Sequence, residues 1–209
     1  MNLSERIMEK TEHFGAHNYH PLPVVISVAK GCKVWDPEGK EYYDFLSAYS
    51  AVNQGHRHPK IIKALKQQAD KCTLTSRAFH NEILGDFLEK LCAFTGYEMA
   101  LPMNTGAEAV ETAIKLARRW GVEKKGIENG KQEMIFVEGN FHGRTVTVIS
   151  ASNDEDSRVN YGPYTSGIKL VPYDDAKALE KAITPNTVAF IFEPIQGEAG
   201  VYVPSKNYL

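Results

Sequence analysis

The sequence predicts an α/β protein in which helices cover a mainly parallel sheet. From residue 99 onward, short apolar runs alternate with helical segments, the pattern of strand–helix–strand units. Residues 24–45 differ, because three short strand-like runs follow one another with only turns between them. These runs predict a β-meander that forms a small lobe or an edge layer of the sheet.

The composition is that of an ordinary globular protein. The 209 residues include 24 Lys plus Arg and 26 Asp plus Glu, a net charge of −2 without a polybasic stripe. Cys32, Cys72 and Cys92 lack C-x-x-C spacing, which fits a reduced intracellular protein. There is no secretory signal pattern, and no apolar run approaches the roughly 20 residues that span a bilayer. We expect a soluble, cytoplasmic protein with neither nucleic acid nor a membrane as partner.

The first half of the chain should contain the meander and two helices. Residues 1–20 are polar and rich in turn formers. Strands are predicted at 24–29, 32–36 and 41–45, and amphipathic helices from Pro59 and near 81–94. His56 and His58 invite a metal interpretation, but a third ligand at useful spacing is missing, so no metal site is predicted.

The stretch at 104–119 should form the helix around which the site is built. Thr105 and Glu108 have the spacing of a capping box, which places the helix start at Gly106. Gly106 and Ala107 leave the first backbone N–H groups uncovered, so a phosphate could bind at the positive end of the helix. A well-capped surface helix with nothing bound is the alternative. Gly121 could end the helix.

The remaining elements alternate regularly. Strands are predicted at 99–103, 133–138, 168–172 and 187–192, and helices from 145 to about 150 and at 175–183, with a long polar loop at 153–167.

Polar residues gather after several of these strands, at 104–107, 139–144, 174–175 and 193–198. Ligands of open α/β sheets bind beyond the carboxyl ends of the strands. Phe141 and His142 offer rings, and Arg144 offers a fork for a carboxylate. Each has a structural alternative: Phe141 in the core, His142 as a helix cap, and Arg144 in an ion pair with Glu198. A phosphate site beside a ring, without a nucleotide-binding motif, suggests pyridoxal phosphate.

Six motifs carry a family resemblance: His17-Asn-Tyr-His-Pro-Leu-Pro23, Tyr49-Ser-Ala-Val-Asn-Gln-Gly-His-Arg-His-Pro59, Thr73-Leu-Thr-Ser-Arg77, Leu101-Pro-Met-Asn-Thr-Gly-Ala-Glu-Ala109, Asn140-Phe-His-Gly-Arg-Thr145 and Glu193-Pro-Ile-Gln-Gly-Glu-Ala-Gly200. With them the chain resembles the class III, fold type I aminotransferases over nearly its whole length. Within that family it is most similar to members that use ornithine, because Tyr19 and Tyr49 stand where relatives that use acetylornithine usually differ.

The resemblance implies a fold and a set of site residues. The fold would be the three-layer fold type I PLP-transferase large domain, incomplete (47–209), preceded by a segment of the small domain (1–46). Thr105, Gly106 and Ala107 would hold the cofactor phosphate, Phe141 would stack on its ring, and Glu193 would lie beside it. His142 stands where some members carry tryptophan, a departure that leaves stacking possible. Tyr19, Tyr49 and Arg144 would bind ornithine, and Glu198 would gate the second substrate.

The implied reaction joins L-ornithine and 2-oxoglutarate, giving glutamate 5-semialdehyde and glutamate. No lysine here matches the family's Schiff-base lysine, and no aspartate matches the partner of the pyridinium nitrogen. We therefore expect a fragment of a homodimeric enzyme, inactive alone and without a catalytic residue of its own. Two alternatives stay open: an acetylornithine or other ω-amino acid aminotransferase, and a non-catalytic phosphate-binding fragment.

Overall fold

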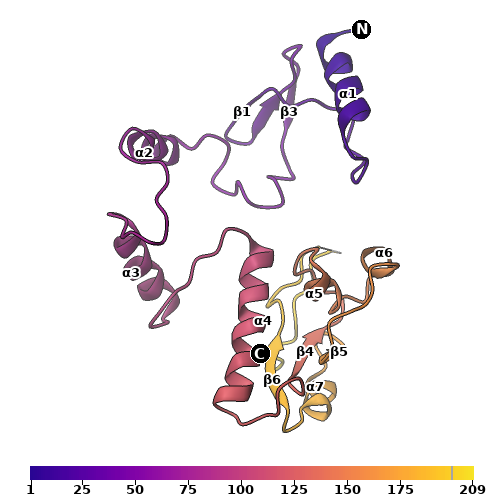
Figure 1. Cartoon of the computed structure of the whole chain (residues 1–209). Helices are drawn as coiled ribbons and strands as arrows, with labels where there is room; N and C mark the ends of the chain where they lie inside the picture. The colour runs from indigo at the N-terminus through magenta and orange to yellow at the C-terminus, as the bar shows by residue number, and fades with distance from the viewer. Residues whose placement is uncertain (199) are drawn as a thin grey trace. The chain divides into compact units, whose positions relative to one another are not determined.

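The computed structural model describes residues 1–198 and 200–209, which form two compact units, Met1–Glu89 and Lys90–Leu209 (Figure 1). Each unit is described by itself. The boundary expected between residues 46 and 47 concerns the domains of a whole enzyme and stays a prediction.

The first unit begins with helix α1 (Leu3–Phe14). The Asn2 side chain accepts the N–H of Glu5 at 2.8 Å, and the Glu5 carboxylate accepts the N–H of Asn2 at 2.7 Å. This reciprocal capping box satisfies two N–H groups that a helix start leaves unpaired. No element was predicted for residues 1–20, so the sequence analysis missed this helix.

The predicted meander is confirmed, with shorter strands. Strands β1 (Val28–Lys30), β2 (Lys33–Trp35) and β3 (Glu41–Tyr43) pair antiparallel in that order. Helices α2 (Pro59–Ala69) and α3 (Leu84–Thr95) lie close to their predicted bounds, and neither contains a buried residue. The apolar run 99–103 is not a strand, contrary to the prediction.

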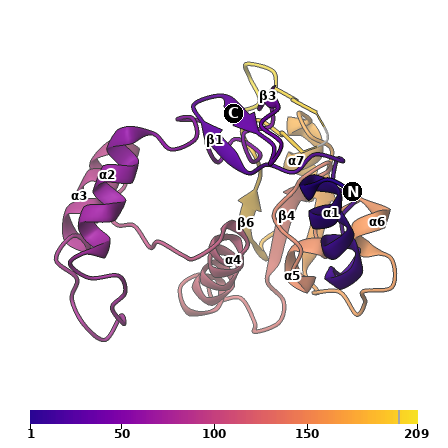
Figure 2. The same cartoon turned by 90° about the horizontal axis from the view of Figure 1, so that it is seen from above.

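The second unit is built on a three-stranded parallel sheet, in the order β5–β4–β6 (Figures 1 and 2). Its strands are β4 (Glu133–Val137), β5 (Ile168–Val171) and β6 (Thr187–Ile191). Its helices are α4 (Gly106–Glu123), α5 (Val146–Ile149), α6 (Glu155–Arg158) and α7 (Ala176–Ala182). Short helix α6 lies inside the predicted loop 153–167; the other elements agree with prediction to within a few residues.

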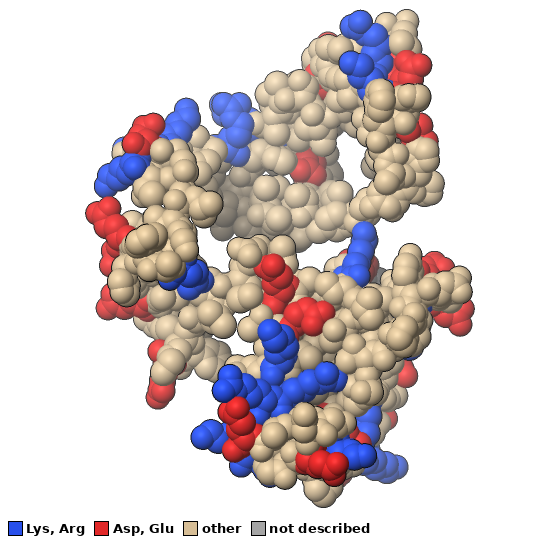
Figure 3. All heavy atoms as spheres, viewed as in Figure 1, with Lys and Arg blue, Asp and Glu red and all other residues tan. Residues whose placement is uncertain are grey.

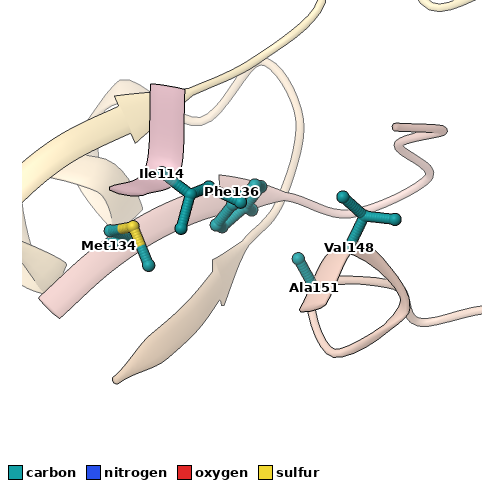
Figure 4. Close-up of a cluster of buried hydrophobic side chains, with 5 residues drawn as sticks. All are labelled: Ile114, Met134, Phe136, Val148 and Ala151. Carbon is teal, nitrogen blue, oxygen red and sulfur yellow. The ribbon is translucent and has the colours of Figure 1, made fainter. Parts of the chain in front are cut away.

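The alternation of side chains along β4 creates two cores. Met134 and Phe136 face Ile114 of α4 and Val148 of α5, as Figure 4 shows. Ile135 and Val137 face the opposite way, where residues of α7 pack against them. Helices thus cover both faces of the sheet, which gives the expected layered α/β architecture.

Gly121 does not end helix α4, which continues to Glu123. It is buried, and a Cβ built on it would overlap the Val188 side chain of β6. The glycine therefore allows close packing of α4 on the sheet. No helix in the described part of the chain is long and apolar enough to cross a membrane.

Candidate cofactor and substrate site

The start of α4 presents open backbone donors. Thr105 caps the helix by accepting the N–H of Glu108 on its hydroxyl at 3.1 Å, as predicted. The Glu108 carboxylate accepts the N–H of Asn104 at 3.0 Å, one residue before the partner that a capping box uses. A Cβ built on Gly106 would meet no atom within 4 Å. An anion can therefore approach the positive end of this 18-residue helix.

The loop after β4 lies against this helix start. Gly143 has a φ of +123°, and a Cβ placed there would lie 2.8 Å from the Cβ of Ala107. Real side chains do not approach so closely, so only glycine fits without displacement. The close contact brings together two segments that the sequence predicted to meet at one edge of the sheet.

Asn140 fixes the course of that loop. Its buried side-chain amide donates to the carbonyl oxygens of Val137 at 2.6 Å and Ala151 at 2.7 Å. The loop is also held by Asn153, whose side chain accepts the N–H of Gly139 at 2.8 Å. Sequence reasoning missed Asn140; the only signal was an amide directly after a buried strand.

The loop after β6 meets the same segment. The Glu193 carboxylate accepts the N–H of Phe141 at 3.1 Å. Gln196, also missed from sequence, donates to the carbonyl of Glu138 at 2.7 Å and exchanges backbone hydrogen bonds with Tyr202. Partial burial raises the pKa of Glu193; the Phe141 N–H opposes this shift, and the nearby charge of Glu198 adds to it.

The two rings of the loop have different surroundings. His142 packs against the core residue Phe136, with 5.7 Å between ring centroids, and burial lowers its pKa. Its Nε2 atom is buried without a hydrogen-bond partner among the described residues. Phe141 is 41% exposed, so its ring is the one that can cover a bound ligand.

A cavity of about 230 Å³ lies beside these loops. Phe141, His142, Arg144 and Glu198 all line it, together with residues of α5 and the segment that follows. One cavity of the second unit is thus lined by a positive side chain, a negative side chain and both rings of the loop. Such a hollow can orient a carboxylate-bearing ligand.

Tyr19 and Tyr49 lie in the first unit, where 55% and 75% of each residue is exposed. Their participation in the site stays a prediction. The described residues contain no group of three or more His, Cys, Asp or Glu side chains that could hold a metal ion. His56 instead lies beside Asp44, with 2.6 Å between its Nε2 and a carboxylate oxygen.

Comparison with known proteins gives a consistent result. The family described as aminotransferase class-III matches residues 14–209. Ornithine aminotransferases from Brevibacillus brevis and Bacillus subtilis are each 62% identical over all 209 residues, which correspond to 52% of either relative. The chain therefore spans about half the length of the curated relatives it matches.

Solved structures give the same family. An ornithine aminotransferase from Toxoplasma gondii superposes with a TM-score of 0.96 at 45% identity, covering 100% of this chain and 49% of that one. An acetylornithine aminotransferase from Elizabethkingia anophelis superposes with a TM-score of 0.84 at 49% identity, with the same coverage of both chains. The chain belongs to the class III aminotransferase family.

Proposed function

We propose that these residues form part of a pyridoxal-phosphate-dependent enzyme that transfers the δ-amino group of L-ornithine to 2-oxoglutarate. The products would be L-glutamate 5-semialdehyde and L-glutamate. The observation that carries the proposal is the close approach of Gly143 to Ala107, which brings the loop that carries the exposed Phe141 against the open start of α4. The names of the relatives from Brevibacillus brevis and Bacillus subtilis support ornithine as the donor.

The residues of the second unit fit the cofactor. The first turn of α4 is open above Gly106, as a phosphate requires, and Thr105 adds a hydroxyl. Phe141 would cover one face of the pyridine ring, with Glu193 holding the Phe141 backbone in place. The buried, unpaired Nε2 of His142 is a polar group that a ligand in the adjoining cavity could satisfy. Bound pyridoxal phosphate supplies the electron sink for the reaction.

The charged residues would orient the substrates. Arg144 and Tyr19 would bind the α-carboxylate of ornithine and direct its δ-amino group toward the cofactor, and Tyr49 would also contact the substrate. Glu198 would hold an arginine from outside these residues and release it when the second carboxylate of 2-oxoglutarate enters. Both Arg144 and Glu198 line the same cavity, which supports these roles.

Transamination needs a lysine that binds the cofactor and moves a proton, and none of the lysines here matches that motif. We therefore propose that the 209-residue chain is inactive alone. The test joins residues 1–209 to the C-terminal part of the Bacillus subtilis relative; we call this chimera the completed enzyme. Formation of glutamate 5-semialdehyde from ornithine by the completed enzyme, and none by the chain alone, is the expected result. A completed enzyme that neither binds pyridoxal phosphate nor uses ornithine would contradict the proposal.

Acetylornithine is the competing donor, because the acetylornithine aminotransferase from Elizabethkingia anophelis is also similar in structure and sequence. The kcat/KM values of the completed enzyme for the two donors decide between them. We expect ornithine to be preferred, since Tyr19 and Tyr49 follow the pattern of enzymes that use it.

The Arg144→Ala substitution tests the carboxylate assignment. Loss of a charged, bidentate contact should raise the transition-state free energy for ornithine by on the order of 2–5 kcal/mol, and kcat/KM should fall accordingly. Arg119→Ala is the matched control, because Arg119 is exposed and pairs with Glu123 on the surface of α4. An unchanged kcat/KM in Arg144→Ala would show that the carboxylate binds elsewhere.

A further inference from the structure

The segment that carries Tyr49 has an unusual backbone. Ser47, Ala48, Tyr49 and Ser50 have consecutive φ values of +51°, +49°, +54° and +69°. The left-handed region is unfavourable for residues with a Cβ, and a run of four such residues is rarer still. Contacts from outside the run must therefore hold it in this conformation.

The Asp44 carboxylate contacts the start of the run, which is also held by backbone hydrogen bonds from Val52 to Ser47 and from Ala51 to Ala48. One oxygen accepts the N–H groups of Leu46 at 3.0 Å and Ser47 at 2.8 Å, which fixes the entry to the left-handed run. The other oxygen lies 2.6 Å from Nε2 of His56, beyond the end of the run. Both side chains are largely shielded, with 13% exposed for Asp44 and 22% for His56. The pair thus links the beginning and the end of one loop.

The same two residues attach the loop to the turn between β1 and β2. The N–H of Asp44 donates to the carbonyl of Cys32 at 2.9 Å. His56 and Gly31 exchange two backbone hydrogen bonds, at 2.9 and 3.0 Å. Gly55 permits this approach, because a Cβ at that position would lie 3.2 Å from the Cα of Gly31.

We propose that Asp44 and His56 are positioning residues for the amino donor, acting by holding the left-handed turn that presents Tyr49. This inference rests on the proposed function and extends it to two residues outside the cofactor site. It also gives His56 a role other than metal binding. Without the pair, the four residues can return to favourable backbone conformations, and the Tyr49 side chain leaves the direction that the fold gives it. The loss should affect donor binding more than turnover.

The experiment uses the completed enzyme with three histidine variants. His56→Ala should raise KM for ornithine about tenfold, leaving kcat and KM for 2-oxoglutarate within about twofold. His56→Gln should recover most of the affinity, because its side-chain N–H can donate to the same carboxylate oxygen. His13→Ala, in exposed helix α1, is the control and should leave all constants unchanged.

A double-mutant cycle with Tyr49→Ala separates positioning from general destabilisation. If the pair acts through Tyr49, adding His56→Ala to Tyr49→Ala should raise KM for ornithine no further. The inference would be overturned if the two substitutions raised KM for ornithine independently, so that their effects multiplied. It would also be overturned if His56→Ala left KM unchanged.

Folding and activity controls complete the test. If His56→Ala does not fold, Asp44→Asn decides. This variant keeps an amide oxygen as acceptor for the Ser47 N–H and removes the carboxylate oxygen that faces His56. KM for ornithine should then rise severalfold, and an unchanged value would overturn the inference. An unsubstituted completed enzyme that binds pyridoxal phosphate yet does not use ornithine refutes the proposed donor, and the role of the pair with it. If the unsubstituted completed enzyme uses ornithine normally and the variants keep the same KM for it, only the role of Asp44 and His56 is refuted.

Discussion

The two units bury their apolar side chains to very different degrees. In the second unit, Met134, Ile135, Phe136 and Val137 of β4 are all 0% exposed. Within the described part of the first unit, Val34 is the only buried hydrophobic residue, whereas Phe45 is 96% exposed. Figure 3 shows acidic and basic side chains on the face in view.

The difference follows from the kind of sheet. A parallel sheet with helices on both faces encloses its central strand completely. An antiparallel meander of three-residue strands has little area to bury, and a small sheet is stable by itself only with a hydrophobic face or a helix packed against it. The second unit should therefore dominate the free energy of unfolding of the chain, and the first should contribute little.

Two phenylalanines test this contrast most strongly. Phe136→Ala should lower the free energy of unfolding of the 209-residue chain by about 3–5 kcal/mol, because it leaves a cavity in a closed core. Phe45→Ala should change it by no more than about 0.5 kcal/mol. Urea unfolding followed by circular dichroism measures both. Equal effects would mean that the first unit has a core of its own.

Substitutions at two helix caps should change the free energy of unfolding by an intermediate amount. Thr105→Ala should cost about 1 kcal/mol of unfolding free energy, because α4 packs through Ile114 on the core and its cap is coupled to the whole unit. Asn2→Ala removes the same type of cap from α1, a helix without buried residues. It should lower helix content without moving the main transition. A shift of that transition by Asn2→Ala would contradict the separation of the units.

Acid titration gives the smallest expected effect. Hydrogen bonds from Lys169 and Thr184 lower the pKa of Glu133 in the second unit, so the folded state favours the ionised carboxylate. That stabilisation is present above the ordinary pKa of 4.5 and is lost as the pH falls through the lowered value. Glu133→Gln should therefore flatten the acid branch of a plot of the urea midpoint against pH.

Glu38 is the matched carboxylate of the first unit. A hydrogen bond from the Ser4 hydroxyl lowers its pKa in the same direction. If the first unit contributes little to global unfolding, Glu38→Gln should leave the acid branch as it is. An identical flattening by both substitutions would show that the two units unfold as one.

The sequence predicted the second unit better than the first, for a physical reason. The apolar run of β4 and the stripe of α4 are packing signals that a layered core requires. Helix α1 lacks such a signal, and only Asn2 and Glu5 indicated its start. The apolar run 99–103 found no strand partner, and Gly121 was interpreted as a helix end because its contact with Val188 exists only in three dimensions.

The candidate site divides in the same way. The rule that ligands bind beyond strand ends predicted that the segments around Ala107, Phe141 and Glu193 would meet, and the structure brings them together. Their roles toward a cofactor remain predictions. Asp174, at another strand end, instead accepts the N–H and hydroxyl of Ser205. Asn140 and Gln196 were missed because a buried amide reveals its function only through the carbonyl oxygens it meets.

The contact between Gly143 and Ala107 also constrains how this sequence can change. Because the two residues share one small space, a larger side chain at either would push the aromatic loop away from the helix start. The small size of both residues thus keeps the loop that carries Phe141 close to the first turn of α4. A Gly143→Ala or Ala107→Val replacement would therefore increase the distance between this loop and the start of α4.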